Sequence, residues 1–478
     1  MKATSIFGGV QIINIILNIV RTKFVAVLLG PVGVGINGLY SSTITLVSSF
    51  TGMGLKMSAI KNIAEKDKPN EVAEVFYILS FWVWITGFLG FILFIIFAEH
   101  LSYFVFDNAN YAIGFRILSI ILLVNQLKDG KQVLIQGTRH IKYLAKVNVF
   151  SSIAGVIIAI PLYYQYNLDG IVPSMLLISI VNLLVTFFFQ QKIKLPKARV
   201  SLRKVWEIGK EILLQGFLLS ISGQILFFTI YSTRIFISSS GTLDDVGLYN
   251  AGYSMTTIYV GMIFNAMGTD YFPRLSKVNQ NRELLINNIN QQLELGIIIL
   301  TPLVCFLIFF IKWIILIIYS EAFLEVTGMV TFMVMGMTFR LLAWVFGYLF
   351  IAKGQAKLFL FNELGMAIYF LAFNFIAFKY FGLTALGIAF LLGYFIYSIQ
   401  VMIICKLRYD IHLEREAFWL FCKCLCLIIG IYISIYSSGE SINFIGLFII
   451  VISFIFSYSE LNKRMDLENI IRNKLFKS

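Results

Sequence analysis

The chain has 478 residues, of which 59% are hydrophobic and only 13% are charged, with a formal net charge of +13 and a mean hydropathy of +0.85. Soluble globular proteins carry about 25% charged residues, so this composition excludes a soluble fold. The apolar runs are also much longer than the alternating segments of about 10 residues that build membrane β-barrels. A helical membrane protein is the class that remains.

Apolar segments long enough to cross a bilayer, roughly 20 residues each, follow one another along the chain. The spans that we predict are residues 4–29, 36–60, 75–98, 112–136, 147–163, 172–189, 211–231, 246–273, 289–317, 328–351, 358–378, 385–405, 417–436 and 443–458. The fold class is therefore an all-α polytopic membrane protein with about 14 transmembrane helices.

The charges between these spans predict the topology. Of the 38 Lys and Arg residues, 27 lie in one alternating set of connections and at the termini, whereas the other set contains only Arg234 and Lys379. Basic loops remain in the cytoplasm, so we expect a multi-pass protein with both termini inside. Because the positive charge is spread over short loops, it does not indicate a nucleic-acid partner.

An internal repeat relates the two halves of the chain. The residues that a shift of 213 positions superimposes are Gln11 with Gln224, Arg21 with Arg234, Ser41 with Ser254 and Lys61 with Arg274. Six spans separate the copies, so the repeat is parallel, as in transporters built from two similar six-helix halves. We predict pseudo-symmetric lobes at 1–195 and 196–408, two further helices within 409–458 and a basic cytoplasmic tail at 459–478.

Polar residues lie on one face of several predicted spans, because positions three, four and seven apart share a helix face. In the second span this stripe consists of Asn37, Ser41, Thr45, Ser48, Gly52 and Lys56. A single Ser, Thr or Asn could equally serve helix packing. Whole polar faces must meet protein or water rather than lipid, so we expect a water-filled cavity between the halves. Its candidate lining residues are Gln11, Asn14, Asn18, Asn125, Gln132, Gln224 and Asn265.

Charged residues within the membrane indicate an anionic cargo. The spans contain nine cations against five acids, and Arg and Lys bind phosphate. The candidate substrate-binding cations are Arg21, Lys56, Arg116, Lys128, Arg234 and Arg340. Lys23 points away from the stripe, which favours an anchor at the lipid headgroups.

The acids Asp129, Asp270 and Glu363 are candidates for coupling transport to H⁺ or Na⁺, and Asp129 could also pair with Lys128 or Lys131. We expect no metal site, because Cys422, Cys424 and Cys426 alternate along a helix and cannot gather on one ion.

Four sequence motifs indicate a family. "RTKFVAVLLGPVGVGINGLY" resembles the first-hairpin signature of polysaccharide exporters, and "TRIFISSSGTLDDVGLYNAGYS" resembles their seventh-to-eighth hairpin. "YLFIAKGQAKLFLFNELG" followed by "FGLTALGIAFLLGY" is similar to their eleventh and twelfth helices. Over roughly residues 1 to 408 the chain resembles the O-antigen flippases of the multidrug/oligosaccharidyl-lipid/polysaccharide (MOP) exporter superfamily.

The resemblance implies a flippase of the bacterial inner membrane that serves lipopolysaccharide or related polysaccharide biosynthesis. It would move undecaprenyl-pyrophosphate-linked oligosaccharide to the outer leaflet by alternating access of two lobes that form a V around a cationic cavity. By this resemblance, Arg21 corresponds to an arginine that lines the family's cavity from the first helix, and Lys56 lies near a basic position of the second helix. No enzyme chemistry and no cofactor are implied. The implied partners are the lipid-linked substrate, membrane lipids and polysaccharide polymerase machinery, with the chain as a monomer.

Two alternatives remain open. A multidrug exporter of the same superfamily would handle cationic compounds, against which the surplus of membrane cations speaks. A membrane polysaccharide polymerase or ligase would need a sizeable outer loop, whereas no predicted outer loop exceeds about 14 residues. Many O-antigen flippases have twelve spans, so the role of the last two helices is open. The lipid II flippase also has fourteen spans and uses the added pair as a lipid groove.

Overall fold

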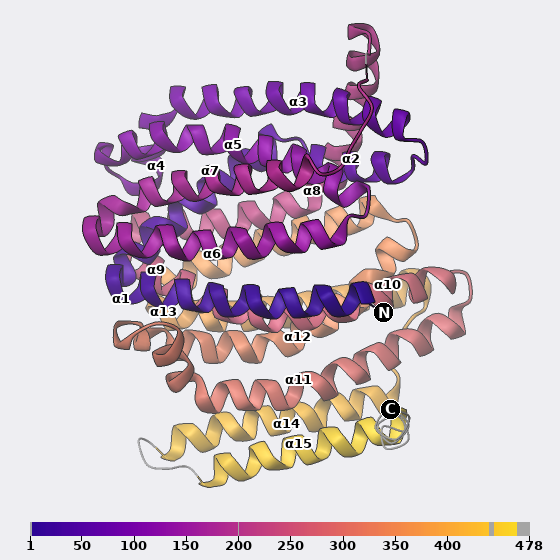
Figure 1. Ribbon diagram of the computed structural model, residues 1–478. Helices are drawn as coiled ribbons and strands as arrows, with labels where there is room; N and C mark the ends of the chain where they lie inside the picture. Colours follow the sequence, from indigo (N-terminus) through magenta and orange to yellow (C-terminus); the bar gives the residue numbers. More distant parts are fainter. Residues whose placement is uncertain (1, 199, 439–443, 466–478) are drawn as a thin grey trace. The chain divides into compact units, whose positions relative to one another are not determined.

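The computed structural model describes residues 2–198, 200–438 and 444–465, apart from the side chains of 2–12, 218, 219, 222, 258, 259, 262, 265, 266, 269 and 465 (Figure 1). Every regular element within these ranges is helical. The elements up to residue 190 are α1 (Lys2–Thr51), α2 (Leu55–Ala64), α3 (Pro69–Ile96), α4 (Ala98–Phe106), η1 (Ala109–Tyr111), α5 (Ala112–Gly137), α6 (Ile141–Tyr166), η2 (Asn167–Gly170) and α7 (Ile171–Gln190). The remaining elements are α8 (Leu202–Ser240), α9 (Leu243–Ser254), the π-helical η3 (Met255–Val260), α10 (Gly261–Lys277), α11 (Arg282–Ile318), η4 (Glu321–Val326), α12 (Thr327–Ala352), α13 (Ala356–Tyr409), α14 (Arg415–Ser438) and α15 (Phe444–Met465).

The helices form two compact units. Unit 1 comprises Met1–Asn250 together with Ile317–Ala322, and unit 2 comprises Ala251–Leu316 with Phe323–Ser478. In unit 1, α5 packs between α3 and α7, and α6 packs against α1 and α7. Apolar side chains from α2, α3, α5, α6, α7 and α8 form a core in this unit, and the indole of Trp82 donates to the carbonyl oxygen of Val205 at 3.1 Å. The core therefore fixes α8 against α3.

Unit 2 is organised around α12. This helix packs along α13, and most of its residues are buried. The last two helices, α14 and α15, lie side by side (Figure 1). The hydroxyl of Ser457 on α15 donates to the carbonyl oxygen of Ile298 on α11 at 2.7 Å, which ties the terminal pair to the rest of the unit.

The helices confirm the prediction of a helical, multi-pass membrane protein. Within the described ranges, nine helical stretches are long and apolar enough to cross a membrane. Three of them, Ile13–Thr51, Ile141–Gln190 and Ala356–Tyr409, have 39, 50 and 54 residues, about twice the length that one crossing needs. The number of fourteen crossings stays a prediction.

Glycine kinks divide two of the long helices where the sequence predicts a break between spans. Gly30 has φ 64° and ψ −169°, and Pro31 follows it. Gly382 in α13 has φ 71° and ψ −161°. A positive φ is accessible to glycine at little cost, and proline supplies no N–H to the helix. The motif "GPVG" thus turns the chain between the first and second predicted spans.

The predicted span over residues 36–60 is not a single unbroken helix. Helix α1 ends at Thr51, and α2 begins at Leu55. Met53 and Gly54 have φ values of 47° and 61°, and a Cβ on Gly54 would lie 2.0 Å from the carbonyl oxygen of Gly216 on α8. The positive φ values take the chain out of the helical path, and the close approach of the two backbones leaves room only for glycine at position 54. Lys56 therefore lies on a separate short helix.

Candidate functional site

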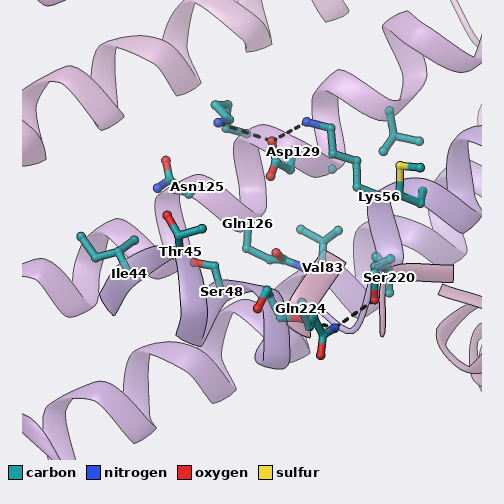
Figure 2. A pocket seen from close by; sticks show the side chains of 18 of the residues that line it. Ile44, Thr45, Ser48, Lys56, Val83, Asn125, Gln126, Asp129, Ser220 and Gln224 are labelled. Carbon is teal, nitrogen blue, oxygen red and sulfur yellow. Dashed lines mark hydrogen bonds and ion pairs between the residues drawn. The ribbon is translucent and has the colours of Figure 1, made fainter. Parts of the chain in front are cut away.

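A polar cavity of about 480 Å³ lies within unit 1. Its walls come from the C-terminal half of α1 and from α2, α3, α5 and α8. The polar and charged side chains that line it are Thr45, Ser48, Ser49, Lys56, Asn125, Gln126, Lys128, Asp129, Ser220 and Gln224 (Figure 2). Of the predicted site residues, the cavity brings together Lys56, Lys128, Asp129, Asn125 and Gln224.

Two lysines share one carboxylate oxygen in this cavity. Asp129 Oδ1 lies 3.1 Å from Lys56 Nζ and 3.4 Å from Lys128 Nζ. Figure 2 shows the ammonium of Lys56 pointing to the carboxylate of Asp129. Lys56 also donates to Gln132 Oε1 at 3.1 Å. Two positive charges against one negative charge leave the cluster cationic. Each of the three side chains is between 26% and 37% exposed.

Close helix packing positions these charged groups. Lys56 follows the contact between Gly54 and Gly216, which sets the start of α2 against α8. Lys128 and Asp129 precede Gly130, where a Cβ would lie 2.7 Å from Cγ2 of Val83 on α3. Because glycine permits this close approach, α5 presents both charged residues to the same space as α2.

Amide and hydroxyl groups form the remainder of the polar wall. Gln224 donates to the carbonyl oxygen of Ser49 at 3.3 Å and to the hydroxyl of Ser220 at 3.0 Å. Gln126 donates to Thr86 Oγ1 at 2.8 Å. Gln126 and Ser220 were not predicted as site residues. Their signals in the sequence are the second amide beside Asn125 and a serine one helical turn before Gln224.

The first-span residues lie elsewhere in unit 1. Asn14 accepts a hydrogen bond from Ser152 on α6 at 3.0 Å, and the guanidinium of Arg21 lies beside Gly155 of the same helix. Asn18 is exposed. Asn14 and Arg21 thus face α6, and neither they nor Asn18 line the cavity.

The other predicted cations of unit 1 are also outside the cavity lining. Arg116 on α5 forms an ion pair with Glu99 of α4. Arg234 lies half-buried on α8, ten residues after Gln224. Lys23 donates to the carbonyl oxygen of Tyr319. The lysine cluster and the repeat-related arginines are therefore different parts of the unit.

Unit 2 contains its own polar network around Glu363. Tyr397 donates to this carboxylate, and Asn362 donates to Tyr397 at 2.9 Å. Arg340 lies over the ring of Tyr394 at 5.4 Å and over that of Phe264 at 5.8 Å. The arrangement places the carboxyl group of Glu363 among apolar helices, with Tyr397 as its hydrogen-bond donor and the amide of Asn362 donating to that same tyrosine.

Asp270 has a different setting from Glu363. Its carboxylate pairs with Arg274 one turn later on α10 at 2.8 Å and is 75% exposed. The side chains of Gln11 and Asn265 lie outside the described residues. Among the residues that the structure does describe, no group of three or more His, Cys, Asp or Glu side chains could hold a metal ion.

A match to a family model identifies the family of the chain. Residues 24–328 match the model of a family described as polysaccharide biosynthesis protein. The chain belongs to this family. Among its curated relatives, the lipid III flippase of Escherichia coli (strain K12) is 24% identical over 356 residues, which cover 71% of this chain and 82% of that protein. A Shigella flexneri protein that carries the name of an O-antigen transporter is 24% identical over 291 residues, covering 59% of this chain and 67% of that protein.

Solved structures show the same fold at low sequence identity. The lipid II flippase MurJ in an inward closed conformation aligns with a TM-score of 0.73 at 14% identity, over 97% of this chain and 99% of that one. A MATE-family multidrug resistance transporter of the MOP superfamily in an inward-facing conformation aligns with a TM-score of 0.70, over 83% of this chain and 94% of that one. The family resemblance predicted from the sequence is confirmed. The named relatives are flippases and transporters rather than enzymes, as we expected.

Proposed function

We propose that this protein flips an undecaprenyl-pyrophosphate-linked oligosaccharide from the cytoplasmic to the outer leaflet of the bacterial inner membrane by alternating access. The observation that carries the proposal is the single carboxylate shared by Lys56 and Lys128 inside a polar cavity. A pyrophosphate carries more negative charge than Asp129 and can replace it as the partner of both ammonium groups. The amides and hydroxyls of the cavity wall offer hydrogen bonds to the first sugar.

The direction of transport follows from the charge of the cargo. Moving one negative charge outward across an inside-negative membrane gains about 2.3 kcal/mol per 100 mV. The potential therefore favours export even without an added ion. Coupling to H⁺ or Na⁺ through Asp129, Asp270 or Glu363 would add to this driving force.

The proposed frame consists of lobes 1–195 and 196–408 around a cationic cavity, a helix pair at 409–458 and a cytoplasmic tail at 459–478. Arg21, Arg116, Arg234 and Arg340 lie outside the lining of the lysine cavity, and their role as further contacts for the anionic headgroup stays a prediction. The proposed partners are the lipid-linked substrate and the polymerase machinery that uses it. The topology is tested by labelling single cysteines from outside: positions 169 and 438 should react, and position 197 should not.

A reconstituted flipping assay tests the proposed function. Proteoliposomes that contain a fluorescent pyrophosphate-linked lipid oligosaccharide report how much of the probe becomes accessible to a reagent outside. We expect the Lys56→Gln, Lys128→Gln double variant to lose most of the flipping. Lys131→Gln is the control for the α5 charge, because it removes one lysine from α5, as Lys128→Gln does, at a side chain that lies over Phe76 and Phe187 outside the cavity lining. Equal flipping by the double variant and the wild type would contradict the proposal.

The fold of the MATE transporter supports a second candidate, a multidrug exporter. A cationic dye tests it directly. Export of the dye without any flipping of the lipid-linked probe would favour this candidate, whereas the surplus of lysine over carboxylate in the cavity favours the anion.

A further inference from the structure

A second hollow of about 410 Å³ lies in unit 2, where α14 begins and α15 ends. Arg415, Glu416, Trp419 and Lys423 from α14 line it together with Glu460 and Arg464 from α15. Both helices of the hairpin that carries it are long and apolar enough to cross a membrane. The pocket therefore combines charged residues with a surface that faces lipid.

The charges on the α15 side of this pocket are already paired. Arg464 binds Glu294 of α11 at 2.8 Å and also pairs with Glu460. Lys463 lies 3.0 Å from the same glutamate. These four side chains together carry no net charge, so the wall that α15 contributes is electrically neutral.

The α14 side is different. Arg415 and Lys423 are both exposed, and neither has a hydrogen bond or ion pair with any residue in the described ranges. With Glu416 as the one acid beside them in the pocket lining, the α14 wall retains a positive charge. The charge of the described pocket lining therefore favours an anionic ligand over a cationic one.

The spacing along α14 defines the shape of the missing partner. Arg415, Trp419 and Lys423 recur every four residues and so share one helix face. Lys423 lies about 12 Å along the axis from Arg415, at a rise of 1.5 Å per residue. Tryptophan between two cations at the end of an apolar helix is typical of the membrane–water boundary. An exposed lysine two turns into such a helix is costly without a charged or hydrated partner.

Apolar side chains continue from this pocket along the hairpin. Ile429 and Ile433 on α14 are 40% and 57% exposed, and Phe448 and Ile455 on α15 are 66% and 63% exposed. A ligand that fills both regions needs an anionic head and hydrocarbon chains. Basic pockets between membrane helices bind the headgroups of acidic lipids in this way.

We propose that the pocket formed by Arg415, Trp419 and Lys423 binds the phosphate headgroup of an anionic membrane phospholipid, whose acyl chains lie along the exposed faces of α14 and α15. The site goes beyond the proposed flippase function, because it belongs to the terminal helix pair and needs no oligosaccharide. The bound lipid is a partner of this helix pair rather than the cargo of the protein.

Lipid binding by the full-length protein in neutral detergent tests the proposal. Native mass spectrometry measures binding of dioctanoyl phosphatidylglycerol, dioctanoyl phosphatidylcholine and glycerol phosphate. We expect saturable binding of phosphatidylglycerol, weaker binding of phosphatidylcholine because its choline offsets the phosphate charge, and the weakest binding of glycerol phosphate. The Arg415→Gln, Lys423→Gln double variant should bind phosphatidylglycerol about tenfold more weakly or worse, since each basic residue near an anionic headgroup adds to the affinity.

Two further variants keep the test independent of folding. Arg415→Lys, Lys423→Arg retains both charges and should keep most of the affinity. Lys312→Gln removes an exposed lysine from α11 outside the pocket lining and should change nothing. Undiminished binding by the double Gln variant would overturn the site. Equal affinity for phosphatidylcholine and phosphatidylglycerol would also overturn it. Equal affinity for glycerol phosphate and phosphatidylglycerol would overturn the lipid site and show a site for free phosphate instead. None of these outcomes depends on the flipping assay.

Discussion

Lys56 Nζ and Asp129 Oδ1 lie 3.1 Å apart, although 73 residues separate them in the chain. The same oxygen lies 3.4 Å from Lys128 Nζ. Partly exposed ion pairs of this kind contribute only about 0.2–1 kcal/mol each. Asp129 is therefore held weakly enough for a phosphate group to replace it, while it still neutralises one of the two lysines when the cavity holds no cargo.

Replacing Asp129 by Asn should make the cavity bind anions more tightly. The substitution leaves both lysines without their carboxylate, so we expect the affinity for pyrophosphate to rise by about five- to tenfold, corresponding to one or two weak ion pairs. Tighter binding should slow release and reduce flipping. Isothermal titration with pyrophosphate measures the first effect. Asp270→Asn, which removes an exposed carboxylate outside the cavity, is the control; an unchanged affinity in Asp129→Asn would argue against the exchange.

The contact between Gly54 and Gly216 should tolerate no side chain. A Cβ on Gly216 would lie 2.6 Å from the carbonyl oxygen of Gly54, so Gly216→Ala must push α2 away from α8. We expect a loss of about 1–3 kcal/mol in stability and reduced flipping, measured by thermal unfolding and by the proteoliposome assay. Gly223→Ala on the same helix is the matched control, since a Cβ there meets nothing within 4 Å. Equal behaviour of the two variants would mean that the contact does not position Lys56.

Arg21 and Arg234 are predicted to act as repeat-related ligands for the headgroup. Both belong to unit 1 but lie outside the lysine cavity, Arg21 beside Gly155 on α6 and Arg234 half-buried on α8. The Arg21→Ala, Arg234→Ala double variant should reach the membrane in normal amount and fail to complement a flippase-deficient strain. Arg→Lys at both sites keeps the charge but loses the planar fork and should restore part of the function. Full complementation by the double Ala variant would leave the lysine cavity as the proposed headgroup site.

The three candidate coupling acids differ in their surroundings, and their variants should differ as well. Glu363 lies in an interior network with Tyr397 and Asn362, whereas Asp270 is largely exposed. If coupling operates through an interior acid, Glu363→Gln should remove the response of flipping to an imposed H⁺ or Na⁺ gradient, and Asp270→Asn should leave it intact. Proteoliposomes with the gradient set across the bilayer measure this. Unchanged gradient dependence in a triple variant of Asp129, Asp270 and Glu363 would exclude coupling by these residues.

The sequence predicted parts of the site because its polar residues recur at helical spacing. Thr45, Ser48 and Lys56 all line the cavity, as the stripe over the second span indicates. The break at residues 52–54 was not predicted, because Gly52 fits the helical stripe as well as it fits a turn. Only the close approach of α8 at Gly216 decides between these two.

The sequence by itself determined the class of the protein. Apolar runs, sparse charge and the "GPVG" motif act locally, because burial in lipid and the permitted φ angles of glycine depend on each segment alone. Which charges meet was decided by the tertiary structure. Arg116 pairs with Glu99 rather than lining the cavity, and Lys56 reaches Asp129 from a separate helix. Ion pairing depends on the rotation and depth of one helix against another, and these are set by side-chain packing between segments far apart in the chain.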